Sequence, residues 1–325
     1  MYPLKFENLY YEKIWGGRHL ELFRDNLPKG NIGESWDVAC HENGMSIVSN
    51  GIFKGKTLKQ VIEEYKDELL GTKIDKEKFP LLVKLINANE PLSVQVHPEN
   101  EYARKVEGEL GKTEVWYVVD AFEGANLVVG TKEGVTKQDI KDALESGDVE
   151  KHLNKVQVKK GDVYFVKSGL IHAIGEGVVI AEIQQNSDTT YRVYDYNRGR
   201  EIHVKKALDV INLQLSSNKR KGLKVIESGY EKTYLCLCEE FSLELYDILE
   251  EAVECSDKER FFIFTCVEGE GIITSGDNKE QIKKGDSFLV PAYLGEYTLK
   301  GNMKLLKSYV PDINKIKNEI LKEVE

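Results

Sequence analysis

Leu92-Ser93-Val94-Gln95-Val96-His97 is the stretch from which the fold of this chain is inferred. Apolar and polar side chains alternate along it, which is the period of a β-strand with two different faces. The polar face carries a hydroxyl, an amide and an imidazole, each about 7 Å from the next. Pro98 ends the strand because proline cannot donate to a β-ladder. Such a face either meets water or lines a pocket, and the following sequence favours a pocket.

The composition excludes several classes of protein. The chain has 325 residues, of which 41% are hydrophobic, so two domains with cores of their own are possible. The 45 basic and 55 acidic residues give a net charge of −10, which argues against nucleic acid or an anionic membrane as the main partner. No apolar run approaches the roughly 18 residues of a membrane span, and residues 1–5 have no secretory apolar region.

The cysteines point to a reducing compartment. There are five, an odd number, and no two of them form a CxxC pair. Cys236, Cys238 and Cys266 lie in strand-like apolar runs. We therefore expect buried thiols in a cytoplasmic protein, not a disulfide framework or a zinc knuckle.

Short strands between glycine-containing turns dominate the rest of the chain, as is typical of antiparallel sandwiches and barrels. Helices are expected only at about 56–71, 136–152 and 203–213, with a polar helical stretch at 99–110 and an amphipathic helix at 312–325. Thr57 and Gln60 form a capping box for the first of them, and Gly71 is a plausible stop. The polar, basic stretch 216–221 predicts a boundary between domains at 1–215 and 222–325.

An internal repeat supports two copies of one β-barrel unit. Residues 158–166, Val-Lys-Lys-Gly-Asp-Val-Tyr-Phe-Val, recur at 282–290 as Ile-Lys-Lys-Gly-Asp-Ser-Phe-Leu-Val, with five identical positions. Lys-Gly-Asp supplies a turn and the apolar run a strand. His172 follows the first copy, whereas no histidine lies in or after the second. The first copy therefore carries the candidate site, and the second is expected to be a degenerate domain without metal ligands.

His97, Glu114 and His172 are the candidate metal ligands, because they stand at strand ends or turns of the first predicted barrel. Two imidazoles and a carboxylate are a common zinc set with one position open. Gln95 shares a strand face with His97, so its amide oxygen is a candidate fourth ligand. Zinc, one ion per chain, is the first choice, and manganese or iron also fits this donor set. The alternative is that each histidine is an ordinary polar residue.

These residues carry a family resemblance. Gly161, Gly169 and His172 are spaced as in the second cupin motif, with Lys167 in place of its usual proline. More specifically, the chain resembles the short bacterial branch of the type I mannose-6-phosphate isomerases through the segments 93–98 (Ser-Val-Gln-Val-His-Pro), 111–114 (Gly-Lys-Thr-Glu), 169–173 (Gly-Leu-Ile-His-Ala) and 185–195 (Gln-Asn-Ser-Asp-Thr-Thr-Tyr-Arg-Val-Tyr-Asp). The resemblance implies a mostly β fold of two cupin-type jelly-roll barrels with a small helical portion. It also implies a metal-dependent interconversion of mannose 6-phosphate and fructose 6-phosphate.

The same resemblance names Gln95, His97, Glu114 and His172 as metal ligands and Arg192 as the catalytic arginine. An aldose–ketose isomerisation moves a proton between adjacent carbons, and the enediolate formed needs its charge stabilised. Lys112 should share a strand face with Glu114 and is a further catalytic candidate, although a metal-bound water or Glu182 could also take the proton. Ser93 and Lys84 are the candidates for the phosphate end of the substrate. Arg192 could instead form a surface ion pair with Asp188 or Asp195.

Three other functions fit parts of this pattern. They are a metal-dependent oxygenase of the cupin class, a sugar-binding cupin without catalysis, and an isomerase of another sugar phosphate, since pocket shape chooses the sugar. The expected partner is a small sugar phosphate, with no nucleic acid or membrane, in a monomer or homodimer.

Overall fold

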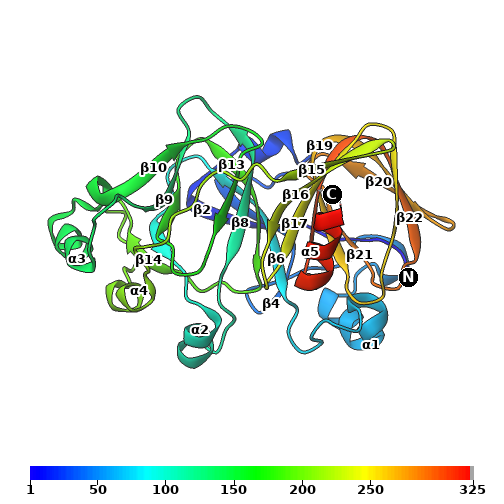
Figure 1. Ribbon diagram of the computed structural model, residues 1–325, viewed down its shortest axis with the longest axis horizontal. Coiled ribbons are helices and arrows are strands. Elements are labelled where there is room, and N and C mark those ends of the chain that lie inside the picture. The colour runs from blue at the N-terminus through cyan, green and yellow to red at the C-terminus, as the bar shows by residue number, and fades with distance from the viewer. Residues whose placement is uncertain (323–325) are drawn as a thin grey trace. The chain divides into compact units, whose positions relative to one another are not determined.

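The computed structural model describes residues 1–322. The fold is mostly β, with 43% strand and 18% helix, which confirms the predicted fold class (Figure 1). The chain forms two compact units, and each is discontinuous in sequence. We call residues 10–35 and 85–220 the central unit, and residues 1–9, 36–84 and 221–325 the terminal unit.

These units differ from the predicted continuous ranges 1–215 and 222–325. The predicted break at 216–221 lies next to an observed division at 220/221, but residues 1–9 and 36–84 belong with the C-terminal segment. The other divisions fall inside strands β2 (Leu9–Gly17), β3 (Ile32–Val38) and β6 (Leu81–Ala88). A strand that runs from one unit into the next leaves no polar linker in the sequence, so composition could not reveal these divisions.

Two antiparallel sheets build the central unit. The six-stranded sheet has the order β11 (Val163–Val166), β8 (Glu114–Ala121), β13 (Val178–Gln185), β6, β3 and β2 (Leu9–Gly17). The five-stranded sheet has the order β10 (Leu153–Gln157), β9 (Asn126–Thr131), β12 (His172–Ile174), β7 (Val94–Val96) and β14 (Tyr191–Tyr194). Side chains from both sheets, among them Trp116, Leu127 and Ile180, form one buried cluster. The central unit therefore has the two-sheet packing expected of a jelly roll.

Strand β7 shows why the alternation in residues 92–97 decides the site. Val94 and Val96 pack in a second buried cluster with residues of α3 (Lys137–Ser146), η3 (Val149–His152) and α4 (Val204–Val210), which lie beside β9 and β14 in Figure 1. Since successive side chains of a strand point to opposite faces, Gln95 points away from these helices. The polar face of the strand is therefore turned toward the barrel interior and not toward water.

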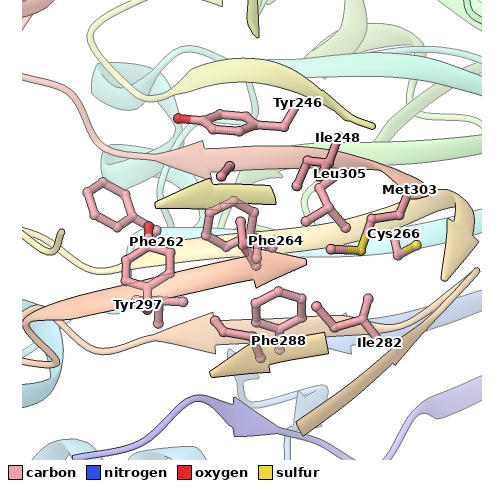
Figure 2. Close-up of a cluster of buried hydrophobic side chains, with 14 of the residues drawn as sticks. Tyr246, Ile248, Phe262, Phe264, Cys266, Ile282, Phe288, Tyr297, Met303 and Leu305 are labelled. Carbon is pink, nitrogen blue, oxygen red and sulfur yellow. The ribbon is translucent and has the colours of Figure 1, made fainter. Parts of the chain in front are cut away.

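The terminal unit is built on one large antiparallel sheet. Its order is β1 (Leu4–Lys5), β21 (Ser287–Val290), β19 (Phe262–Ser275), β22 (Glu296–Tyr309), β17 (Ser242–Ile248), β16 (Tyr230–Leu237) and β15 (Leu223–Glu227). In addition, β18 (Glu251–Cys255) pairs with β22, and β20 (Asn278–Lys283) pairs with β19. The hairpin of β4 (Cys40–His41) and β5 (Gly44–Met45), η2 (Gly51–Phe53), α1 (Leu58–Leu70) and α5 (Ile313–Lys322) complete the unit. Figure 2 shows its core, with Tyr246, Phe262 and Tyr297 at one end and Met303, Cys266 and Ile282 at the other.

The internal repeat corresponds to one strand in each unit. The first copy ends in β11, which pairs with β8 so that Val166 lies opposite Glu114. The second ends in β21, which pairs with β19 so that Val290 lies opposite Phe262. On the other side of β8 lies β13, and on the other side of β19 lies β22. The two units therefore share a three-stranded arrangement, and Phe262 occupies the position that Glu114 has in the central unit.

Most predicted elements are present with shorter bounds. The capping box of Thr57 and Gln60 forms as expected, and α1 ends at Gly71. The central unit also contains η1 (His19–Leu22) and α2 (Asn100–Val106), and α2 lies inside the predicted helical stretch. Residues 323–325 of the predicted C-terminal helix lie outside the described residues. All five cysteines are free thiols, but only Cys266 is fully buried and Cys255 is exposed, so burial of the thiols was predicted too widely.

Gly71 is expected to be essential for the stability of the terminal unit. Its φ is +96°, and an added Cβ would lie 2.2 Å from the Glu259 carbonyl carbon and 2.3 Å from the Arg260 nitrogen. Gly55 is a matched control, because its φ is +87° but a Cβ there would meet nothing within 4 Å. We expect Gly71→Ala to lower the free energy of unfolding by about 2–3 kcal/mol more than Gly55→Ala. Urea denaturation would measure this, and equal costs would contradict the assigned contact.

Candidate metal centre

Three buried side chains converge inside the central unit. His97 follows β7, Glu114 begins β8 and His172 begins β12, and one ligand atom of each lies within 4.8 Å of the others. The His97 and His172 Nε2 atoms are 3.1 Å apart, and each is 3.5 Å from an oxygen of Glu114. None of the three side chains is more than 1% exposed. The predicted cluster of two histidines and one carboxylate is therefore present as a compact group.

The spacing of these atoms fits a metal ion. Ligand atoms around a tetrahedral zinc ion with bonds of about 2.0–2.1 Å are about 3.3 Å apart. The separations of 3.1 and 3.5 Å among the three donor groups lie on either side of that value. The donor set could hold a divalent metal, and the geometry does not choose among zinc, manganese and iron.

The hydrogen bonds of the two histidines leave their Nε2 lone pairs facing the centre. The His97 Nδ1 lies 2.9 Å from the Thr189 carbonyl oxygen, and the His172 Nδ1 lies 2.8 Å from the Leu170 carbonyl oxygen. A carbonyl only accepts, so Nδ1 carries the proton in both rings and Nε2 is the bare nitrogen. Burial lowers the pKa of His172 to about 3, despite the opposing bond to Leu170, so this ring is neutral. The two Nε2 lone pairs lie 3.1 Å apart and repel each other, and the Lys112 ammonium lies 3.1 Å from the His97 Nε2. Backbone bonds of this kind are the usual support of metal-binding histidines.

Gln95 and Lys112 lie against the same atoms. The Gln95 Nε2 is 3.5 Å from Nε2 of His97 and 3.4 Å from Nε2 of His172, while its Oε1 accepts from the Ser93 hydroxyl at 3.3 Å. Turning the amide by 180° would bring the oxygen to the centre, since the two ends have the same shape. The Lys112 Nζ is 3.1 Å from the His97 Nε2 and also contacts the Glu114 carboxylate.

Arg192 is brought to this group by strand pairing. Gln95 lies opposite His172 on one neighbouring strand and opposite Arg192 on the other. Residues directly opposite in an antiparallel pair share a face, so all three side chains project to the same side. Arg192 Nη1 donates to the Glu201 carbonyl at 2.8 Å, and its buried Nε has no hydrogen-bond partner within the described chain. Burial, with Arg200 and Arg198 nearby, lowers the Arg192 pKa, although Asp195 opposes this.

The remaining predicted site residues are buried, in different surroundings. Ser93 is 3% exposed and bonds to Gln95, as described above. Glu182 is 3% exposed, accepts from the Trp116 indole at 2.9 Å and lies 3.9 Å from the Lys112 Nζ. Lys84 belongs to the terminal unit, is 4% exposed and has its Nζ 4.8 Å from the Trp36 ring centroid. A contact between Lys84 and a substrate therefore stays a prediction.

Two arginines near Arg192 were missed at the level of sequence. Arg198 and Arg200 both contact the buried Asp195 carboxylate, Arg198 at 2.9 Å. Burial alone would raise the Asp195 pKa, but these two guanidinium groups hold it below its usual value. Asp195, one of the two predicted alternative partners of Arg192, is therefore paired with Arg198 and Arg200. Their spacing of three and five residues after Asp195 is the signal that could have revealed them.

A buried His-Glu-His group inside two packed antiparallel sheets defines this chain as a cupin with a candidate metal centre. Comparison with known protein families then specifies the class. Residues 4–124 match the catalytic domain of type I phosphomannose isomerases, and residues 230–310 match the cupin domain of mannose-6-phosphate isomerases.

Individual relatives give the same result. The chain is 39% identical to mannose-6-phosphate isomerase ManA of Bacillus subtilis over 315 residues, covering 95% of this chain and 99% of the relative. It is 37% identical to mannose-6-phosphate isomerase of Streptococcus mutans, covering 94% and 98% of the two chains. The crystal structure of the Bacillus subtilis mannose 6-phosphate isomerase superposes with a TM-score of 0.89 at 36% identity, covering 95% of this chain and 99% of that chain. The chain therefore belongs to the type I mannose-6-phosphate isomerase family, and the predicted class of enzyme is confirmed.

Every helix within residues 1–322 is too short or too polar to span a bilayer.

Proposed function

We propose that the chain interconverts mannose 6-phosphate and fructose 6-phosphate, and that the reaction depends on one zinc ion held in the central unit. The observation that carries this proposal is the buried group of His97, Glu114 and His172, with donor atoms 3.1–3.5 Å apart. The names of the Bacillus subtilis and Streptococcus mutans relatives supply the substrate. Burying two imidazoles and a carboxylate costs free energy unless hydrogen bonds, ion pairs or a metal ion compensate for the lost water. A purely structural core would be more stable with apolar side chains at these positions.

In this proposal Gln95, His97, Glu114 and His172 hold the ion. A bound divalent cation supplies Lewis-acid polarisation of the carbonyl and hydroxyl oxygens of the sugar. The chain contributes the placement of the four donor side chains and the tautomers that the Leu170 and Thr189 carbonyls hold. It also excludes bulk water, since the two histidines and the glutamate are at most 1% exposed.

Lys112 and Arg192 supply the positive charges that the reaction needs. The ammonium of Lys112 contacts Glu114 and lies 3.9 Å from Glu182, so a cation stands beside two buried carboxylates. Arg192 projects to the same side as Gln95 and His172, and its guanidinium fork suits an enediolate or a phosphate oxygen. The proton removed from C2 of the aldose is delivered to C1, and the O2 hydroxyl proton passes to O1. The charge that develops on these oxygens is stabilised by the two cations.

Ser93 is assigned to the phosphate end within the central unit, and Lys84 of the terminal unit stays a separate candidate. Ser93 offers a buried hydroxyl that already donates to Gln95 and would exchange that partner for a phosphate oxygen. Lys84 offers a buried ammonium next to Trp36. Removing the Ser93 hydroxyl or the Lys84 charge by substitution should raise the KM for mannose 6-phosphate more than it lowers kcat.

A chelation experiment tests the proposed function. We expect the purified protein to convert mannose 6-phosphate to fructose 6-phosphate, to lose this activity in a chelator and to regain it when zinc is added. The same preparation should not consume oxygen, which separates it from a cupin oxygenase. Binding of mannose 6-phosphate without turnover, or full turnover after complete removal of metal, would contradict the proposal.

A further inference from the structure

The terminal unit contains a cavity of its own at the place where the central unit has its metal group. Strand pairing establishes the equivalence. Glu182 lies opposite Trp116 across β13 and β8, and Lys307 lies opposite Phe264 across β22 and β19. Because Phe262 occupies the position of Glu114, Lys307 occupies that of Glu182. Both Phe262 and Lys307 line a cavity of about 170 Å³. A single water needs only roughly 10–15 Å³, so this space is large enough for a small organic molecule.

The chemistry of this cavity differs from that of the metal group. Its lining contains no histidine, and Phe262 replaces the carboxylate. Lys307 is 6% exposed, and its Nζ lies 4.3 Å from the Phe262 ring centroid, 3.1 Å from Glu254 Oε2 and 3.2 Å from the Tyr246 hydroxyl. Glu254 also accepts from Tyr246 at 2.9 Å. These groups form a polar centre inside an aromatic core, and Figure 2 shows the Tyr246 and Phe262 rings at the same end of that core.

The charges around the cavity cancel. Its lining has four basic and four acidic side chains. Three of the basic groups are held by acidic neighbours: Lys307 by Glu254 at 3.1 Å, Arg260 by Asp257 at 3.0 Å and Lys315 by Asp257 at 3.4 Å. A small anion on any of these three, or a metal cation on Glu254 or Asp257, would therefore have to break an existing ion pair. An uncharged ligand with several hydroxyl groups needs no such change, because it can add hydrogen bonds to carboxylates and ammonium groups that remain paired.

The aromatic lining favours a sugar among such ligands. Tyr246, Phe262 and Tyr309 line the cavity together with Glu244 and Glu254. Carboxylates accept from neighbouring hydroxyls, and ring faces pack against the C–H face of a pyranose. We propose that this cavity is a second, metal-free ligand site that binds an uncharged monosaccharide. It is independent of the isomerase reaction proposed for the central unit.

Cys255 provides a direct test, because it is an exposed thiol in the cavity lining. The full-length protein is treated with iodoacetamide, and alkylation of each cysteine is followed by peptide mass spectrometry with and without D-mannose. We expect D-mannose at ten times its dissociation constant to slow alkylation of Cys255 about tenfold. Alkylation of Cys40, which lies outside the lining, should be unchanged.

Two glutamates on β18 give a matched pair of variants. Glu254 pairs with Lys307 at 3.1 Å in the cavity, and Glu251 pairs with Lys300 at 3.1 Å outside it. We expect Glu254→Gln to lose the protection and Glu251→Gln to keep it. Phe262→Leu keeps an apolar side chain but removes the ring, and it should also abolish the protection of Cys255 by D-mannose. This variant replaces Glu254→Gln in the test if Glu254→Gln does not fold.

Two results would overturn the inference. One is no protection of Cys255 by D-mannose up to about 100 mM, far above a weak millimolar dissociation constant. The other is protection by inorganic phosphate but not by the sugar, which would make this an anion site.

Discussion

Replacing His172 with alanine should remove the metal and reduce kcat/KM for mannose 6-phosphate by at least about 10³-fold. The substitution leaves His97 and Glu114 as two of the three closest donors, and Lewis-acid catalysis supplies several kcal/mol of transition-state stabilisation. Elemental analysis of the untreated protein should find one zinc ion per chain in the wild type and almost none in His172→Ala. The terminal unit should stay folded, because none of its residues is a proposed ligand.

His152→Ala is the matched control for this experiment. His152 is a half-buried histidine at the end of η3, and it is not part of the cluster. This variant should keep both zinc and activity. Retention of zinc at full stoichiometry by His172→Ala would show that the ion is bound elsewhere and would remove the assigned site.

Arg192→Ala should lower kcat by about 10²–10³-fold while the zinc content stays at one ion per chain. Loss of one preorganised donor to a developing negative charge typically has this effect. The guanidinium projects to the same side as Gln95 and His172, but it is not placed as a ligand. Arg192→Lys keeps the charge without the fork of donors and should recover only part of the lost activity. Steady-state kinetics combined with metal analysis separates this effect from loss of the metal.

Arg220→Ala is the control for Arg192. Arg220 is an exposed arginine of the central unit whose guanidinium lies 5.8 Å from the Phe165 ring centroid. Its substitution should leave kcat unchanged. If Arg192→Ala kept wild-type kcat, the guanidinium would have no part in the reaction, and stabilisation of the charge would fall to Lys112 and the metal alone.

The candidate site was predictable because its residues lie on strands with strong patterns. Strict alternation around Val94 and Val96 placed Gln95 and His97 on one face, and the structure confirms that the valines pack on the helical side. The repeat at 158–166 and 282–290 located equivalent strands, β11 and β21. What alternation cannot supply is the pairing between strands, so the closeness of Gln95 to Arg192 and His172 became visible only in the fold.

The parts that sequence could not predict have physical causes. Strands β18 and β20 are short, charged and attached beside the main path of their sheet, so they lack the apolar alternation that marks a strand. The assignment of residues 36–84 to the terminal unit depends on long-range packing, which local composition does not record. The spacing of Arg198 and Arg200 after Asp195 suggests contacts among them, but the burial of that carboxylate is not visible in a polar stretch of sequence.

Anomalous diffraction at the zinc absorption edge, from crystals of the untreated protein, tests directly whether His97, Glu114 and His172 bind one divalent ion. We expect one strong peak about 2.0–2.2 Å from Nε2 of both histidines and from a Glu114 oxygen. If the crystallised protein carried one zinc ion per chain but the peak lay anywhere else, the assignment of these three residues as ligands would be contradicted.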